Sequence, residues 1–134
     1  MSFYEELTKQ LKIHEGFRQF PYRCTAGRLT IGIGRNLDAK GVSEEEAEEL
    51  LQNDIYDVEI QLDKNIPWWR NKPENVQLVL MDMCFNLGMS GLLTFDKFLH
   101  AVRLGFWETA QMEMMNSLWA TQVGTRADNL REML

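Results

Sequence analysis

The sequence has few cysteines, and it lacks both a long apolar run and a basic leader. Only Cys24 and Cys84 carry thiols among its 134 residues, too few for the disulfide framework of a small secreted protein. We therefore expect two free thiols. The apolar runs are short and interrupted, which predicts no insertion into a membrane. The first residues show no basic region before an apolar one, which predicts no signal peptide.

The sequence also lacks the patterns of a metal centre and of a nucleic-acid interface. No cluster of His, Cys and Asp has metal-ligand spacing, so we expect no metal and no cofactor. Residues 1–43 carry seven Lys or Arg and four Asp or Glu, residues 44–63 carry nine acids and no base, and residues 64–134 carry seven of each. The net charge of −6 is therefore one local acidic block. Because no large basic face remains, we expect no nucleic-acid partner.

What the sequence does contain is typical of one globular domain. Hydrophobic residues make up 45% and charged residues 25% of the chain, the ordinary balance of a water-soluble protein. A chain of this length is long enough to bury a real core. We expect a single domain over residues 1–134 and a monomer.

The chain begins with a helix signal and continues with a hairpin signal. Ser2 and Glu5 form a capping box, and an apolar residue recurs every fourth position, which predicts a helix over about 3–13. Pro21 and a turn at 25–27 follow, and alternation then predicts a β-hairpin within 17–36. Its apolar face is expected toward the core and its other face, which carries Thr30 and two glycines, toward an approaching group. Residues 36–41 are expected to form a loop.

The rest of the sequence predicts helices. A second capping box, Ser43 to Glu46, opens a helix over about 43–64 that carries the nine acids on its outer faces. The segment from Pro73 to Gly88 is apolar nearly all round and is expected in the middle of a core, followed by a turn at 90–91. Further helices are expected at about 94–104, 107–118 and 125–133. The predicted class is mostly helical α+β.

The position of Glu15 in this arrangement suggests a functional hypothesis. Glu15 follows the first helix and precedes the hairpin whose open face carries Thr30. A long helix then joins a small β-containing part to a helical part, which suggests a cleft with an acid in it. Taken without further information, a glutamate at a helix end is most often a surface residue.

The spacing of three residues resembles a known family signature. Glu15, eight residues, Cys24, five residues and Thr30 match the Glu-x8-(Asp or Cys)-x5-Thr pattern of the phage-type lysozymes, the endolysin muramidases of glycoside hydrolase family 24. The runs Thr-Ile-Gly-Ile-Gly at 30–34 and Phe-Asn-Leu-Gly at 85–88 are similar to that family's strand and central helix. Trp119 with Arg126 is similar to its C-terminal segment, so the resemblance follows nearly the whole chain in order.

The resemblance implies an α+β lysozyme fold and a specific reaction. Its lobes would be a β-containing lobe at about 13–45, a linking helix at about 43–64, and a helical lobe made of 1–12 and 65–134. The reaction would be hydrolysis of the β-1,4 bond between N-acetylmuramic acid and N-acetylglucosamine in peptidoglycan, whose glycan strands are the expected partner. Such an endolysin would wait in the host cytoplasm until a separate membrane-permeabilising protein releases it to the cell wall.

The resemblance also implies a role for each site residue. Glu15 would be the general acid that protonates the glycosidic oxygen. Cys24 would replace the second carboxylate, and Thr30 would help hold the attacking water. The residues expected to contact the substrate are Gly34, Arg35, Phe85 and Asn86.

Three of these assignments leave alternatives open. Cys24 can act as a thiolate, if nearby arginines lower the pKa of its thiol, or it can be passive. Phe85 can form a wall of the cleft or be a plain core aromatic. Arg35 stands where the family very often has a His. Because pairing with Glu15 alone would favour the ionised acid, we expect Arg35 to have another acceptor, such as an acid of the next helix.

Two rival functions remain open from the sequence. The first is a binding module of the same fold that holds glycan without cleaving it, since Cys24 and Arg35 replace the usual pair. The second is a helical interaction protein that uses the acidic helix at 43–64.

Overall fold

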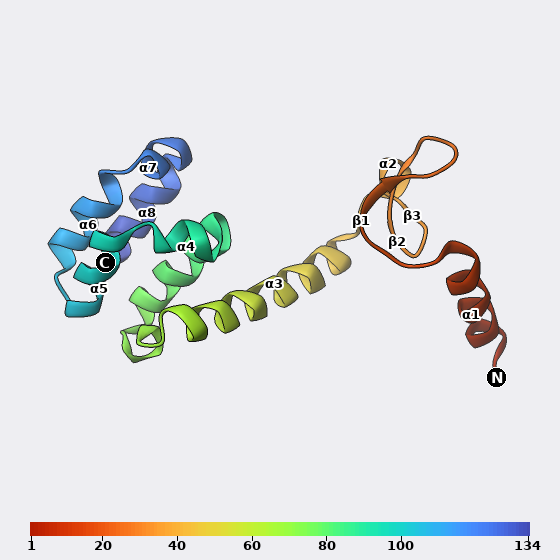
Figure 1. Cartoon of the computed structure of the whole chain (residues 1–134), viewed down its shortest axis with the longest axis horizontal. Helices are drawn as coiled ribbons and strands as arrows, with labels where there is room; N and C mark the ends of the chain where they lie inside the picture. Colours follow the sequence, from red (N-terminus) through yellow and green to blue (C-terminus); the bar gives the residue numbers. More distant parts are fainter. The chain divides into compact units, whose positions relative to one another are not determined.

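The computed structural model describes all 134 residues. The chain is 71% helical and contains one three-stranded sheet, so the predicted mostly helical α+β class is confirmed. Its contacts divide it into two compact units, Met1–Glu49 and Leu50–Leu134. These are coloured red to yellow and yellow-green to blue in Figure 1. The assignment of all residues to one domain with the lobes given above stays a prediction.

The N-terminal unit begins with helix α1 (Phe3–Glu15). Its predicted start is confirmed, since the Ser2 hydroxyl oxygen accepts a hydrogen bond from the Glu5 N–H at 3.1 Å. The helix runs two residues further than predicted and ends at Gly16, whose positive φ of 69° suits a helix end. Glu15 is therefore the last helical residue.

The sheet is a meander of three antiparallel strands, β1 (Arg18–Arg23), β2 (Leu29–Gly32) and β3 (Arg35–Asn36). Thr30 is on the central strand, opposite Tyr22 on one side and Asn36 on the other. The predicted turn between β1 and β2 is present. The Cys24 N–H donates to the Arg28 carbonyl at 2.9 Å, and the Gly27 N–H donates to the Cys24 carbonyl at 2.8 Å.

Two expectations about this unit are wrong. Thr30 is on the buried side, with 4% of its surface exposed, whereas Ile33 is 44% exposed. Ile33 is exposed because β2 ends at Gly32 and Ile33 belongs to the following tight turn, whereas Leu29 and Ile31, on either side of Thr30, are half-buried. The expected loop is a one-turn helix, α2 (Leu37–Lys40), because the Asn36 side chain caps its start by accepting the Ala39 N–H at 3.0 Å.

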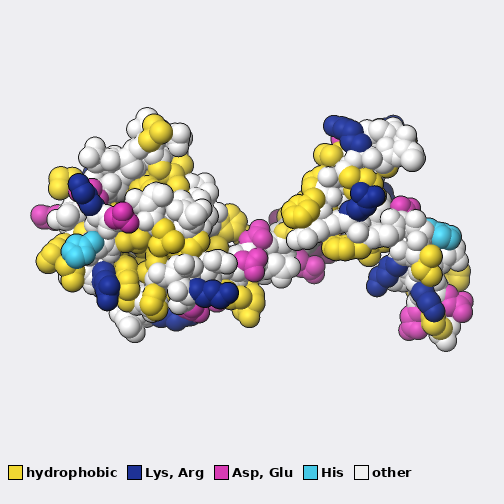
Figure 2. All heavy atoms as spheres, viewed as in Figure 1, with side chains coloured by type: hydrophobic (Ala, Val, Ile, Leu, Met, Phe, Trp, Pro, Cys, Tyr) yellow, Lys and Arg dark blue, Asp and Glu magenta, His cyan; other side chains and the backbone are white.

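Helix α3 (Glu44–Asn65) begins at the predicted capping box, and both halves of the box are formed. The Glu46 N–H donates to the Ser43 hydroxyl at 3.1 Å, and the Ser43 N–H donates to Glu46 Oε1 at 2.9 Å. The boundary between the two units falls within this helix. Acidic side chains are visible along it in Figure 2.

The C-terminal unit is helical and contains all the buried apolar side chains of the molecule. Its elements after α3 are η1 (Trp69–Asn71), α4 (Glu74–Leu93), α5 (Asp96–Leu104), α6 (Trp107–Met115), α7 (Leu118–Val123) and α8 (Thr125–Met133). The largest fully buried side chains include Trp69, Phe98, Leu80 and Met83. Their burial supplies the main driving force for folding of this unit.

Two helix boundaries in this unit differ from the expectation. Gly88, with φ of 75°, interrupts α4 where the helix was expected to end, but helical structure resumes through 90–91, the expected turn. The helix expected at 107–118 is two helices, α6 and α7. The Ser117 hydroxyl caps the start of α7 by accepting the Ala120 N–H at 3.1 Å. The apolar repeat therefore belongs to two helices and not to one.

Helix α4 is an exception to the short apolar runs of the sequence. It is long and apolar enough to cross a membrane by length and composition, with a mean hydropathy of 1.5 over its most apolar window. Six of its side chains are buried in the core of the C-terminal unit, a property expected of a core helix. The absence of membrane insertion stays a prediction.

Candidate functional site

The Glu15 side chain is packed against a glycine of the β2–β3 turn. A Cβ atom placed on Gly34 would be 2.7 Å from Glu15 Cδ and Oε2, closer than any real side chain allows. Gly34 also has a φ of 70°, a left-handed conformation that favours glycine. The absence of a side chain at Gly34 thus lets the carboxyl group of Glu15, which is otherwise exposed, lie against the turn at the edge of the sheet.

Cys24 and Thr30 form a second contact on the same sheet. Cys24 follows β1, is half-buried and is a free thiol. Thr30 is the only buried residue of the N-terminal unit, and its hydroxyl donates to the Arg28 carbonyl at 2.9 Å. The structure thus brings together the second and third residues of the spacing motif, at the start of β2.

The environment of Cys24 lowers the pKa of its thiol. The main cause is hydrogen bonding from the backbone N–H of Arg28, followed by that of Ala26, and partial burial opposes it. The Thr30 hydroxyl also faces the sulfur, but its single proton already points to the Arg28 carbonyl. The direction agrees with the expectation, although backbone N–H groups, and not arginine side chains, are the cause.

Arg35 binds an acid of the next helix, which is one of the arrangements expected from the sequence. Its Nη1 and Nη2 donate to Oε1 and Oε2 of Glu46 at 2.8 and 2.6 Å, and Nη1 also donates to the Gly41 carbonyl at 3.1 Å. Hydrogen bonds from the Arg35 side chain, followed by those from Ser43, lower the pKa of Glu46 from its ordinary 4.5 to about 2. The guanidinium is therefore directed to Glu46 and paired with it.

Phe85 and Asn86 are exposed residues of α4 in the C-terminal unit. Phe85 is 45% exposed and is not part of that unit's core, so the interpretation as a core aromatic is wrong there. The Asn86 Oδ1 accepts the Trp119 Nε1–H at 2.7 Å, which leaves the exposed amide nitrogen of Asn86 without a partner. Arg126 Nε donates to Asp82 Oδ1 at 2.8 Å.

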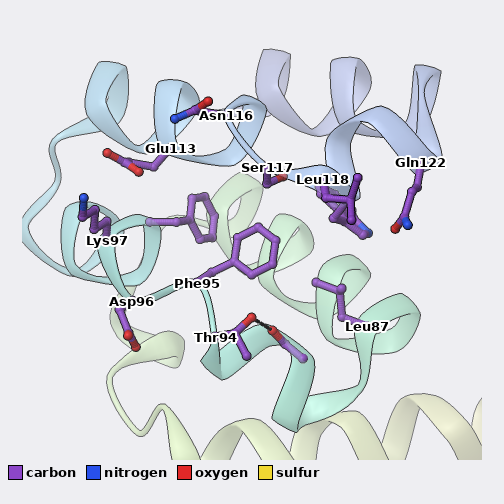
Figure 3. Close-up of a pocket in the computed structure, with 13 residues that line it drawn as sticks. Leu87, Thr94, Phe95, Asp96, Lys97, Glu113, Asn116, Ser117, Leu118 and Gln122 are labelled. Carbon is purple, nitrogen blue, oxygen red and sulfur yellow. Dashed lines mark hydrogen bonds between the residues drawn. The ribbon is translucent and has the colours of Figure 1, made fainter.

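A groove of about 570 Å³ lies in the C-terminal unit. Figure 3 shows Phe95 in its middle, with Leu87 and Leu118 on one side and the polar side chains of Lys97, Glu113 and Asn116 around it. It includes none of the residues predicted from the sequence as catalytic. We place the candidate catalytic centre at Glu15 because the close backbone approach and the perturbed thiol are on the sheet beside it.

The structure therefore divides the predicted residues into four groups. Glu15 contacts Gly34, Cys24 lies beside Thr30, Arg35 pairs with Glu46, and Phe85 and Asn86 belong to the other unit. Sequence reasoning missed two residues that support the sheet. Glu46 was recognised only as half of a capping box. Asp38, which we expected in a loop, accepts the Leu29 N–H at 2.7 Å. Its position shortly after Asn36 was the only signal in the sequence for this structural role.

Comparisons with known proteins agree on one family. Residues 12–132 match the family described as phage lysozyme. The chain is 33% identical over 110 residues to the "Endolysin" of Acyrthosiphon pisum secondary endosymbiont phage 1, covering 78% of this chain and 72% of that protein. It is 27% identical to "Probable T4-type lysozyme 2" of Dictyostelium discoideum, covering 92% and 90%.

A third relative is much longer than this chain. The "Pre-baseplate central spike protein Gp5" of Enterobacteria phage T4 is 26% identical over 152 residues. The alignment covers 92% of this chain but only 26% of the spike protein, so the chain spans about a quarter of that relative.

Proposed function

Because the chain belongs to the phage lysozyme family, we propose that it hydrolyses the β-1,4 bond between N-acetylmuramic acid and N-acetylglucosamine in peptidoglycan. The family and the names of the relatives support a lysozyme-like glycosidase function. The observation that carries the finer proposal is the Glu15 carboxyl group, held against Gly34 on the sheet that also bears Cys24 and Thr30.

In the proposed reaction Glu15 is the general acid. Its protonated carboxyl group gives a proton to the glycosidic oxygen as the bond from that oxygen to the sugar C1 breaks. An acid in this role must keep one orientation, because a displaced proton donor loses much of its effect. The close packing of Glu15 on Gly34 supports this role.

Cys24 and Thr30 are proposed to serve the water that attacks the sugar. A thiolate at Cys24 either accepts a proton from this water or stabilises the positive charge that develops at C1. The lowered pKa of the Cys24 thiol supports the thiolate over a passive residue. Thr30, fixed by the Arg28 carbonyl beside the sulfur, is proposed to hold the water through its hydroxyl oxygen.

Two residues of the C-terminal unit are also proposed to contact glycan. Asn86 can donate its free amide N–H to an acetamido carbonyl, because its oxygen accepts the Trp119 Nε1–H. The exposed ring of Phe85 can pack on a sugar face. Gly34 is proposed to border the substrate beside the Glu15 carboxyl group, which it contacts. For Arg35, the two-point bond to Glu46 favours a role other than direct contact.

The proposed setting follows from the same relatives. The protein would be a bacteriolytic endolysin acting on peptidoglycan strands as a monomer, reaching the wall from the host cytoplasm through a separate membrane-permeabilising protein. The alternative is a glycan-binding module of the same fold that does not cleave its ligand.

Digestion of purified peptidoglycan separates the two functions. Released reducing ends are reduced with borohydride and identified by mass spectrometry. New reducing ends on N-acetylmuramic acid support the proposed hydrolysis, and new ends on N-acetylglucosamine alone contradict the assigned bond. Binding to peptidoglycan or chitooligosaccharide with no new reducing ends supports the binding module.

The role of Cys24 is tested by measuring the hydrolytic activity of three variants as a function of pH. Cys24→Asp supplies a carboxylate and should keep activity, whereas Cys24→Ala and Cys24→Ser should lose it, because neither holds a negative charge near neutral pH. Full activity of Cys24→Ala would show that the residue is passive.

A further inference from the structure

Three groups meet on the single carboxylate of Glu46. Its Oε1 accepts the Ser43 N–H at 2.9 Å and Arg35 Nη1 at 2.8 Å, and its Oε2 accepts Arg35 Nη2 at 2.6 Å. A capping box requires only the first of these bonds. The two-point pair with Arg35 is additional, and its planar fork fixes orientation as well as distance.

Arg35 is connected to the candidate acid through its neighbour in the chain, Gly34. Arg35 is the first residue of β3 and pairs with Ile31 of β2, so it closes the turn that contains Gly34. Gly34, its immediate neighbour in the chain, is the residue whose backbone is packed on the Glu15 carboxyl group. A displacement of Arg35 would therefore move the surface that holds Glu15.

The pairing also determines where the charge of Arg35 is directed. The guanidinium donates to Glu46 and to the Gly41 carbonyl, both at the start of α3 or just before it. Without Glu46 it would lose its only acidic partner. A free guanidinium on the residue next to Gly34, which contacts Glu15, would favour the ionised form of that acid, which opposes proton donation.

We propose that Glu46 is a positioning residue for the active site, holding Arg35 and through it the β2–β3 turn whose Gly34 contacts the Glu15 carboxyl group. This inference rests on the proposed function for its catalytic consequence and on the contacts above for its structural one. The N-terminal unit has no buried apolar side chain to hold this turn, so the ion pair and the hydrogen bonds of the sheet must do so.

The substitution Glu46→Gln tests the proposal with little disturbance elsewhere. Glutamine also satisfies the capping box, so the start of α3 is kept while the charged pair with Arg35 is lost. Glu45→Gln is the matched control, because it removes the same charge from the same helical turn and Glu45 has no hydrogen-bonded or ionic partner. Both variants are compared with wild type in kcat, KM and the NMR resonances of the Gly34 amide and the Glu15 side chain.

We expect Glu46→Gln to lower kcat about tenfold with KM within twofold, as for a modest misplacement of a catalytic group, and to shift both sets of resonances. Glu45→Gln should change neither. A kcat for Glu46→Gln within twofold of the control, or unchanged Gly34 and Glu15 resonances, overturns the proposal.

A double substitution shows whether the two partners act together. Arg35→Gln with Glu46→Gln should reduce kcat no more than the worse single variant, since each single change already breaks the same pair. Multiplying effects would mean that Glu46 acts independently of Arg35, which overturns the proposal. If the wild-type chain cleaves no peptidoglycan, the proposed function fails, whereas the NMR comparison still decides whether Glu46 positions Gly34 and Glu15.

Discussion

In the C-terminal unit, apolar side chains from α3 to α8 meet in one buried cluster, whereas the only buried residue of the N-terminal unit is Thr30. The N-terminal unit is held by hydrogen bonds, by left-handed glycines and by the Arg35–Glu46 pair. The candidate catalytic residues Glu15 and Cys24 belong to this second, polar kind of structure. The buried apolar core and the predicted catalytic residues thus belong to different units of the chain.

The two thiols give the largest expected contrast between the units. Partial exposure and a lowered pKa make Cys24 reactive, whereas burial raises the pKa of the Cys84 thiol, which is 3% exposed in the core. Iodoacetamide at pH 8 should alkylate Cys24 roughly a thousandfold faster than Cys84, because Cys84 reacts only when the core opens. Peptide mass spectrometry over time measures both alkylation rates. Equal rates would contradict the difference between a reactive Cys24 and a protected Cys84.

Truncation of the core should cost far more stability than truncation on the sheet. Leu80→Ala removes a fully buried side chain and should lower the free energy of unfolding by about 3 kcal/mol. Phe20→Ala on β1 removes a ring that is 73% exposed, so its cost should stay below about 1 kcal/mol. Urea unfolding followed by circular dichroism measures both, and a larger cost for Phe20→Ala would show that the sheet unit depends on apolar burial.

Alanine substitutions at two glycines distinguish the effect of backbone strain from the effect of contact with Glu15. Gly34 and Gly27 both have a positive φ, so alanine at either should cost about 1 kcal/mol of stability. Only at Gly34 would the new Cβ meet Glu15, since nothing lies within 4 Å of that position at Gly27. Gly34→Ala should therefore lower the hydrolysis rate by about 100-fold and Gly27→Ala should not. Equal losses in the two variants would mean that the Glu15 contact is unimportant.

The smallest expected effect is a pH dependence of stability in the N-terminal unit. Because the folded state holds the pKa of Glu46 at about 2 against an ordinary 4.5, the pair stabilises the fold above about pH 4.5. This contribution is lost as the pH falls toward 2. The difference in Tm between wild type and Glu46→Gln should therefore be present at pH 7 and vanish near pH 2. A difference independent of pH would contradict the ion pair.

The sequence predicted the elements whose signals are local and redundant. The capping boxes at Ser2 and Ser43 located two helix starts, because a cap and an apolar repeat agree there. The signature of Glu15, Cys24 and Thr30 led to the family, which the comparisons confirm. Their individual roles stay predictions.

The features that the sequence could not give are those in which one residue serves two purposes. The sequence led us to expect an acid of the next helix as the partner of Arg35, but it did not identify Glu46, which already had a complete explanation as a helix cap. Thr30 is buried while its neighbours Leu29 and Ile31 are half-buried, so β2 does not have the one buried apolar face and one open polar face that the alternation predicted. Short capped helices such as α2 and α7 carry too few residues for a periodic signal.

The central claim is that Glu15 is the acid of the reaction, and one paired measurement tests it most directly. Initial rates of reducing-end release from peptidoglycan are compared for Glu15→Gln and Glu113→Gln, the second being an acid of the groove in the C-terminal unit. The account predicts a loss of roughly 1,000-fold for Glu15→Gln and a rate within twofold of wild type for Glu113→Gln. A Glu15→Gln variant that keeps more than about a tenth of the activity, or an equal loss in Glu113→Gln, would contradict it.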